Sequence, residues 1–256
     1  MRNIRLIARL DVKAPNLVKG IQFEGLRKLG TPEKYAQKYY KQGIDEIYFE
    51  DIVASLYERN SLASLIEETS ENIFVPITVG GGLRKVEDVQ TVLRAGADKV
   101  AINTAAIKQP SIITAVAEKF GSQCMVLSIQ AKKQNGGWEA YFDNGRERSG
   151  LDVADWAKKG AALGAGEIIL TSVDREGTAS GFDIELIQAV VDRVDIPVIA
   201  SGGMGTLEDA ENAVLSGRVD AIAMAHVLHY NILVPADIRT HFVTKGIPVR
   251  KIERSI

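Results

Sequence analysis

The chain contains the same passage twice, at positions about half a chain apart. Residues 76–106 read PITVGGGLRKVEDVQTVLRAGADKVAINTAA, and residues 197–226 read PVIASGGMGTLEDAENAVLSGRVDAIAMAH. Each passage has an apolar run, a Gly-Gly step, a helical stretch that opens near acidic residues, a glycine and a second apolar run. Extending the match upstream places Asp11 opposite Gln130. The repeat predicts a fold of two similar halves, of which only one keeps an acid at this position.

Short β-rich runs alternate with helical stretches along the whole chain. The runs occupy residues 4–11, 46–51, 74–79, 99–103, 124–129, 167–172, 197–201 and 221–225. The helical stretches occupy residues 32–42, 58–70, 85–95, 111–119, 152–163, 183–193, 206–215 and 235–243. Eight such units in 256 residues predict a parallel sheet closed into a (β/α)8 barrel. We expect one domain, residues 1–256, built from duplicated half-barrels of about 1–121 and 122–256. An open doubly wound sheet is the alternative, and the even repeat argues against it.

Two segments between elements exceed the usual loop length. Residues 13–30 follow the first expected strand, and residues 131–148 follow the fifth. The second segment contains Asn135-Gly136-Gly137, which predicts a hairpin. Both segments leave the carboxyl ends of their strands, where the active sites of such barrels form.

The composition excludes several classes of protein. A net charge of −2 gives no electrostatic reason to bind nucleic acid or an anionic membrane. The apolar runs are too short to span a bilayer, and charged residues interrupt the amino-terminal run, unlike a signal peptide. Cys124 stands alone, and the three histidines lack a neighbouring carboxylate cluster, so we expect neither disulfide nor metal. We therefore expect a cytoplasmic protein without a cofactor.

Glycine-rich steps follow two equivalent strands. Gly80-Gly81-Gly82 ends the third strand and Ser201-Gly202-Gly203 the seventh, and bare glycines let backbone N–H groups approach an anion. The next strand ends supply Asn103-Thr104 and Ala225-His226. Tight turns are the alternative for either step alone. Two symmetric steps predict a ligand with a phosphate at each end, and residues 174–178 would close over one end.

Several phrases resemble those of a known family, the HisF cyclase subunit of imidazole glycerol phosphate synthase. They are LDVK (10–13), VKG (18–20), DIVAS (51–55), TVGGG (78–82), GADKVAINTAA (96–106), GAGEIILTSVDREGT (164–178) and IASGG (199–203). The resemblance implies a (β/α)8 barrel and a lyase reaction of histidine biosynthesis. It also implies ammonia from a HisH-type glutaminase on the amino-terminal face, and a bisphosphate ribulosyl substrate at the carboxyl face.

The resemblance assigns roles to individual residues. Asp11 matches the catalytic acid of the family and Lys19 a lysine of its mobile loop. The matches at the phosphate and substrate positions are Gly82, Asn103, Thr104, Thr171, Gly177, Ser201, Gly203 and His226. A ring that gates ammonia is matched by Arg5, Glu46, Lys99 and Glu167, and a contact to the glutaminase by Asp98. Ordinary solvated charges are the alternative for the ring.

The sequence departs from the family at its second catalytic carboxylate. Gln130 stands where the family has an aspartate, and an amide forms hydrogen bonds but does not transfer protons in the same way. Losing one acid/base group typically lowers a rate by about 10²–10⁴-fold. Glu176, His226 and Asn144 are further departures.

Other functions therefore stay open. One is a HisF-like paralogue that channels ammonia to a nucleotide-sugar amidotransferase in lipopolysaccharide or other surface-polysaccharide synthesis. A non-catalytic binding module and an isomerase of the related histidine-pathway barrels are further alternatives.

Two charges are expected inside the barrel. Strand parity places Arg9 on the same face as Asp11, and Glu50 on the same face as Glu46. A buried unpaired charge is very unfavourable. We therefore expect an ion pair between Arg9 and Glu50 across adjacent strands.

Overall fold

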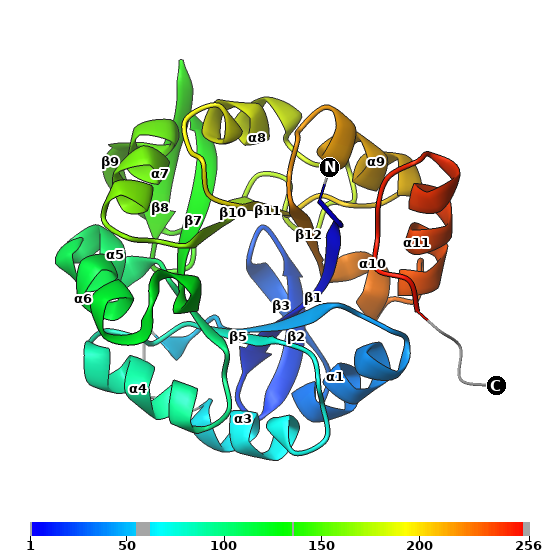
Figure 1. Cartoon of the computed structure of the whole chain (residues 1–256), viewed down its shortest axis with the longest axis horizontal. Helices are drawn as coiled ribbons and strands as arrows, with labels where there is room; N and C mark the ends of the chain where they lie inside the picture. The colour runs from blue at the N-terminus through cyan, green and yellow to red at the C-terminus, as the bar shows by residue number, and fades with distance from the viewer. Residues whose placement is uncertain (1, 55–61, 135, 253–256) are drawn as a thin grey trace.

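Eight parallel strands close into a barrel in this computed structural model, which describes residues 2–54, 62–134 and 136–252 (Figure 1). In barrel order the strands are β1 (Arg5–Lys13), β4 (Glu46–Asp51), β5 (Ile77–Gly80), β6 (Lys99–Ile102), β7 (Met125–Gln134), β10 (Glu167–Ser172), β11 (Val198–Ser201) and β12 (Ala221–Met224). Pairing of β7 with β10 and of β12 with β1 closes the sheet. The expected (β/α)8 barrel, a TIM barrel, is confirmed, and the boundary between half-barrels near residue 121 stays a prediction.

Helices surround the strands on the outside (Figure 1). They are α1 (Pro32–Lys41), α3 (Ala63–Ser70), α4 (Val86–Arg94), α5 (Thr104–Lys108), α6 (Ser111–Phe120), α7 (Val153–Ala162), α8 (Ile184–Val191), α9 (Leu207–Leu215), α10 (His226–His229) and α11 (Pro235–Thr244). The expected helix 58–70 is seen from Ala63, and its first residues lie outside the described part, as do Ser55 and Asn135. Among the described residues, no helix has the length and apolar character needed to cross a membrane.

The strands bury different side chains on their two faces. Outward side chains pack with the helices in one large apolar cluster. The barrel interior has a small cluster of its own, formed by Ile7, Tyr48, Ala101, Val126, Ile169, Ile199, Ala221 and Ala223. Because side chains alternate along a strand, Arg5, Arg9 and Asp11 share the interior with Ile7. The interior therefore has charged side chains on both sides of a thin apolar layer.

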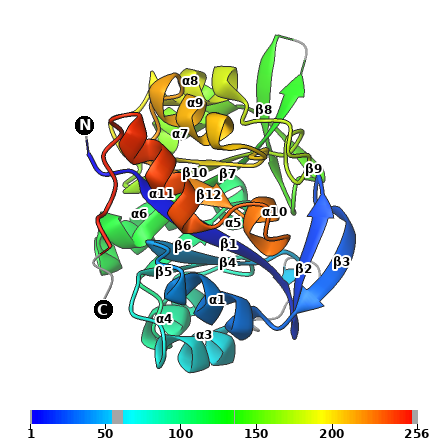
Figure 2. The same ribbon diagram turned by 90° about the vertical axis from the view of Figure 1, so that its right-hand side faces the viewer.

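Two hairpins extend from one end of the barrel, opposite the end where the two termini lie (Figure 2). One is β2 (Asn16–Ile21) with β3 (Glu24–Gly30), and the other is β8 (Gly137–Phe142) with β9 (Glu147–Asp152). Residues 13–30, expected only as a long loop, are thus mostly paired strand. At the tip, Gln22 and Phe23 adopt positive φ angles of 52° and 65°, and Phe23 is nevertheless buried. The tip folds inward over the mouth of the barrel.

The two repeated passages form equivalent parts of the barrel. Residues 76–106 contain β5, α4 and β6, and residues 197–226 contain β11, α9 and β12. Each helix begins with the same capping contact. Asp88 Oδ2 accepts the backbone N–H of Lys85 at 3.2 Å, and Asp209 Oδ2 accepts that of Thr206 at 2.8 Å. The repeat therefore extends to the local hydrogen bonds that start each helix.

Candidate active site

Asp11 and Gln130 lie inside the carboxyl end of the barrel, on β1 and β7. Both residues are buried, with 2% of the Asp11 surface and 3% of the Gln130 surface exposed to solvent. The charge beside Asp11 is Arg9, whose Nε donates to Asp11 Oδ1 at 2.9 Å. The expected ion pair between Arg9 and Glu50 is wrong, since none of the ion pairs among the described residues joins them. Arg9 neutralises the catalytic candidate on its own strand instead.

The guanidinium of Arg9 reaches across the barrel interior. Its Nη1 donates to Thr171 Oγ1 on β10 at 3.0 Å and to Ser201 Oγ on β11 at 3.2 Å. Its Cζ lies 5.3 Å from the ring centroid of Phe23 and 5.5 Å from that of Tyr48. Both distances fit cation–π attraction. Arg9 thus connects the barrel wall to the tip of the β2–β3 hairpin.

Lys19 ties the same hairpin to the loop after β10. Its Nζ forms a buried ion pair with Glu176 and lies 3.8 Å from Asp11 Oδ2. The carbonyl oxygen of Gly20 would lie 2.4 Å from a Cβ atom at Gly177, so only glycine allows this contact. Lys19 and Gly177 are therefore brought together, as expected of groups that close over one end of a ligand.

A cavity of about 230 Å³ lies at the carboxyl ends of β5 and β6. Its lining includes the three residues expected at the first phosphate position, Gly82, Asn103 and Thr104, and it includes Asn144. The lining also includes Gln130 and Glu50. The structure therefore joins the first phosphate position and the altered acid position in one open space.

Two polar side chains of this cavity, those of Asn103 and Thr104, are held by β7 and by the β8–β9 hairpin. Asn103 Nδ2 donates to the carbonyl oxygens of Ser128 at 3.0 Å and Tyr141 at 3.1 Å. Thr104 Oγ1 accepts the backbone N–H of Asp143 at 3.1 Å. These bonds fix both side chains before any ligand binds, which reduces the ordering that binding requires.

The second phosphate position is nearly filled. Gly177, Ser201, Gly203 and His226 line a cavity of only about 20 Å³. Burial and the neighbouring charge of Lys19 lower the pKa of His226, so its imidazole is neutral near pH 7. The predicted residues are together, but the two symmetric positions differ in open volume by an order of magnitude.

The acids at the carboxyl end differ in ionisation. Burial alone would raise the pKa of Asp11, but Arg9 and Lys19 outweigh it and hold the pKa below its ordinary value. Burial raises the pKa of Glu50 to about 8, against the attraction of Arg9 and with further increases from Asp11 and Asp51. The raised pKa favours the neutral form of Glu50 at pH 7, whereas the lowered pKa of Asp11 favours its ionised form.

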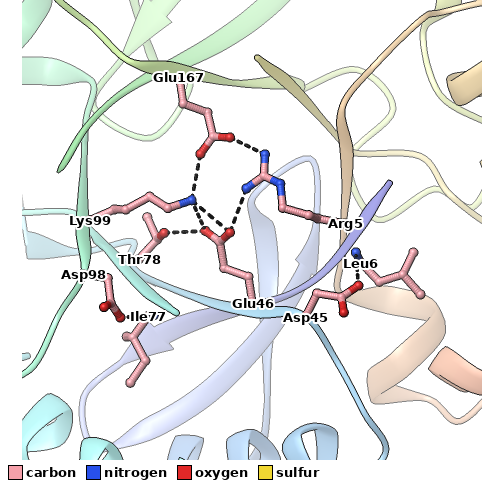
Figure 3. Close-up of polar contacts among 9 residues, drawn as sticks. All are labelled: Arg5, Leu6, Asp45, Glu46, Ile77, Thr78, Asp98, Lys99 and Glu167. Carbon is pink, nitrogen blue, oxygen red and sulfur yellow. Dashed lines mark hydrogen bonds and ion pairs between the residues drawn. The ribbon is translucent and has the colours of Figure 1, made fainter. Parts of the chain in front are cut away.

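At the other end of the barrel the four expected ring residues do meet (Figure 3). Arg5 contacts both Glu46, at 2.9 Å, and Glu167. Lys99 Nζ lies 2.9 Å from Glu46 Oε2 and 2.9 Å from Glu167 Oε2. Thr78 Oγ1 donates to Glu46 Oε1 at 2.6 Å. We call Arg5, Glu46, Lys99 and Glu167 the charged ring, and its two cations and two anions alternate around the barrel opening.

Asp98 is exposed at the same end of the barrel. One of its oxygens, Oδ2, accepts the backbone N–H of Ile77 at 2.8 Å (Figure 3). Asp45 makes the same contact with Leu6 at 2.9 Å. Asp98 therefore fixes the start of a strand, and its role toward a partner stays a prediction.

Sequence reasoning missed the contributions of Phe23 and Tyr48 and gave Glu50 the wrong partner. Phe23 lies in a turn of a segment that was expected only as a long loop, so its burial was not anticipated. Strand parity was the available signal for Tyr48, because this residue lies on the same face of its strand as Glu46 and Glu50. In residues 2–54, 62–134 and 136–252, no group of His, Cys, Asp and Glu side chains is placed to hold a metal ion.

The chain is similar in sequence to proteins of one family. The family model described as a histidine biosynthesis protein matches residues 5–233. The imidazole glycerol phosphate synthase subunit HisF of Legionella pneumophila is 60% identical over 210 residues, which cover 82% of this chain and 99% of that protein. The subunit HisF of Dehalococcoides mccartyi is 47% identical over 250 residues, which cover 98% of this chain and 99% of that protein.

Proposed function

This chain belongs to the HisF family of imidazole glycerol phosphate synthase subunits, and we propose how its barrel performs that synthase reaction. It is a lyase-type subunit of histidine biosynthesis. Ammonia adds to a bisphosphate ribulosyl substrate at the carboxyl face, and ring closure with C–N cleavage gives imidazole glycerol phosphate and an aminoimidazole carboxamide ribotide. We place the reaction in the cytoplasm, where such phosphorylated intermediates are made.

One observation carries this proposal: the barrel interior forms a path from the charged ring at the amino-terminal end to Asp11 at the carboxyl end, and only a thin apolar layer separates the two. Arg5 and Asp11 lie on the same interior face of β1, six residues apart. The two glycine-rich loops, which end β5 and β11, flank the carboxyl end of this path. Substrate phosphates at Gly82 and Gly203 would hold the reacting carbon between them, close to Asp11.

Asp11 acts as the base and proton shuttle. Its ionised carboxylate accepts a proton from the nitrogen of the ammonia adduct, and its conjugate acid returns a proton in later steps. Arg9 orients the carboxylate, and Lys19 closes the hairpin so that water is excluded. Gln130 orients substrate by hydrogen bonds, because its amide does not serve as an acid or base.

The ammonia donor is a glutaminase subunit of the HisH type, docked at the amino-terminal end. Opening of the charged ring would admit ammonia, and Asp98 is positioned at the rim for contact with the partner. No step here involves a nucleic acid or a membrane.

One observation favours a second candidate, a paralogue that delivers ammonia to a nucleotide-sugar amidotransferase. Gln130 lacks the family's second acid, and the acid that is kept, Asp11, is paired with Arg9 inside the barrel. In that function the barrel would conduct ammonia without carrying out ring closure.

Turnover of the bisphosphate substrate by the full chain with excess ammonium salt tests the proposal without any glutaminase. A rate within about tenfold of another HisF subunit is the expected result and would exclude the paralogue. Absence of turnover in a folded chain, with turnover restored by Gln130→Asp, would overturn the ordinary synthase reaction.

A further inference from the structure

Several buried polar atoms at the carboxyl end of the barrel lack a hydrogen-bond partner among the described residues, and three of them belong to β4 and β7. They are Glu50 Oε2, Tyr48 OH and Gln130 Oε1. A buried polar atom left without a partner typically destabilises a protein by about 1–3 kcal/mol. A ligand that forms hydrogen bonds with such atoms would explain why they persist in the native protein.

These atoms belong to one region. Glu50 and Gln130 both line the cavity of about 230 Å³ that contains the first phosphate position. Asp11 is not part of that lining, because Arg9 and Lys19 cover it. Three acids do line this space, Glu50, Asp51 and Asp143, and Glu50 has a buried carboxyl oxygen without a hydrogen-bond partner among the described residues.

Gly80 provides the room for the Glu50 carboxyl. A Cβ atom at Gly80 would lie 2.6 Å from Glu50 Oε2 and 2.7 Å from Tyr48 OH. In parallel register, Glu50 pairs with Asp11 on one side and with Gly80 on the other. The carboxyl thus occupies space that any side chain at residue 80 would take.

We propose that Glu50 is a catalytic proton donor of this chain, in place of the acid that Gln130 lacks, and this inference rests on the proposed function. The second acid of the family stands at the position of Gln130, on β7. Glu50 is instead on β4, the strand next to Asp11. Gln130 remains in the same cavity as a hydrogen-bonding group.

Imine formation balances in protons when Glu50 begins as the proton donor and Asp11 begins as the proton acceptor. Ammonia adds to the substrate carbonyl carbon, the C=O electron pair moves to oxygen, and that oxygen takes the Glu50 proton. The positively charged nitrogen of the adduct gives one proton to Asp11. When the C–O bond breaks, Asp11 returns that proton to the departing water. The iminium nitrogen then gives a proton to Glu50, which restores both starting states.

The ionisation of the two acids supports this division. Burial raises the pKa of Glu50 to about 8, whereas burial of Asp11 is outweighed by Arg9 and Lys19, which lower its pKa. The charges facing Glu50 are Arg9, Asp11 and Asp51. Two acids whose environments separate their pKa values in this way suit a donor and an acceptor.

The test compares Glu50→Gln with the unaltered full chain, using saturating ammonium salt and bisphosphate substrate. We expect kcat to fall by about 10²–10⁴-fold with KM changed by less than about threefold. In the unaltered chain, kcat at saturating free ammonia should fall as the pH rises through about 8, and the variant should lose this alkaline limb. Adding Gln130→Asp to the variant should restore at least about tenfold, because it returns an acid to the cavity.

Glu211→Gln is the matched control, since Glu211 pairs with His241 and Lys245, on α11 and just beyond it, away from the cavity. It should leave kcat within about twofold. Glu50→Asp should fall between the unaltered chain and Glu50→Gln, because it keeps a shorter acid. Activity of Glu50→Gln within about threefold of the unaltered chain, with the alkaline limb intact, would overturn the proposal.

A second readout separates this inference from the proposed function. If the unaltered chain shows no turnover, the proposed function fails, and infrared difference spectra then decide on Glu50. A protonated carboxylic acid band at pH 7, absent from Glu50→Gln and shifted by added imidazole glycerol phosphate, would support a proton donor at the cavity. Absence of that band in the unaltered chain would reject it.

Discussion

The charged ring at the amino-terminal end of the barrel is fully paired, whereas the carboxyl end keeps buried polar atoms without a partner. The ring holds two cations and two anions, and each contacts two of opposite sign. At the carboxyl end, Arg9 and Lys19 are paired, but Glu50 Oε2 and Gln130 Oε1 have no hydrogen-bond partner among the described residues. A thin apolar layer that includes Ile7 lies between the two ends.

This difference separates a structural set of charges from a reactive one. In the ring, every charge has partners of opposite sign in the protein, so removing one member mainly disturbs the others. At the carboxyl end, some buried polar atoms have no hydrogen-bond partner among the described residues, so a ligand can form hydrogen bonds with them. Paired and unpaired interiors can therefore be told apart by which variants change stability and which change turnover.

The largest expected effect comes from Asp11→Asn, which breaks the paired part of the carboxyl end. It should lower ammonium-dependent turnover by about 10²–10⁴-fold. It should also destabilise the chain by about 3–5 kcal/mol, because Arg9 is left buried without its anion. Urea unfolding and steady-state kinetics measure the two effects. Adding Arg9→Leu should recover stability but not turnover, and recovery of both would contradict the role of Asp11.

The next effect is a pH dependence of stability that originates at Glu50. Its pKa is raised from 4.5 to about 8 in the folded chain, so between these values the unfolded chain has lost a proton that the folded chain keeps. Stability from this group is therefore greatest below about pH 4.5 and declines as the pH rises to about 8. The free energy of unfolding should fall by about 3–5 kcal/mol over this pH range. Water that enters the site would make this fall smaller.

Urea unfolding at a series of pH values measures this decline. Glu50→Gln should remove it and should be more stable than the unaltered chain at pH 8. Equal slopes in the two proteins would show that Glu50 is ionised at neutral pH.

A smaller effect is expected in the ring, from Lys99→Met. Glu46 and Glu167 would then share Arg5 alone, and the free energy of unfolding should fall by about 1–2 kcal/mol. The loss is moderated because the Lys99 side chain is 17% exposed and water screens the charges. Ammonium-dependent turnover should change by less than about threefold. Lys158→Met, at an exposed position on α7, is the control, and a turnover loss as large as that of Asp11→Asn would remove the distinction between the ends.

The smallest effect is expected from Phe23→Ala at the hairpin tip. Its ring is one of the two that flank the Arg9 guanidinium, and losing that contact should destabilise the closed hairpin by about 1 kcal/mol. Hydrogen exchange of the β2 and β3 amides should become faster while the rest of the barrel is unchanged. Ile21→Ala is the matched control in the same hairpin, because Ile21 is 60% exposed. Equal exchange in the two variants would mean that the tip does not hold the hairpin.

The barrel and the ring were both predictable from the sequence. The alternation of elements and the repeat predicted the fold, and the four residues of the ring were predicted from the resemblance to the HisF family. The partner of Arg9 was not predictable in this way. Parity gives the face of a strand but not the direction of a long side chain, and Arg9 spans the interior to Thr171 and Ser201.

The hairpin of residues 13–30 was missed for a different reason. Most of β3 is exposed or only partly buried, so its sequence lacks the alternation of apolar and polar residues that marks a strand. The burial of Phe23 also depends on contacts with Arg9, which is distant in the chain. A contact between residues so distant in the chain is not predictable from the local sequence.

The space at Gly80 also links the evolutionary histories of two positions. A lineage that carries Glu50 cannot accept a side chain at residue 80 without moving the carboxyl, since a Cβ atom there would lie 2.6 Å from Glu50 Oε2. A lineage with a smaller residue at 50 is released from this restriction. Substitutions at 50 and 80 are therefore expected to show epistasis, in which the effect of a side chain at residue 80 depends on whether residue 50 is glutamate.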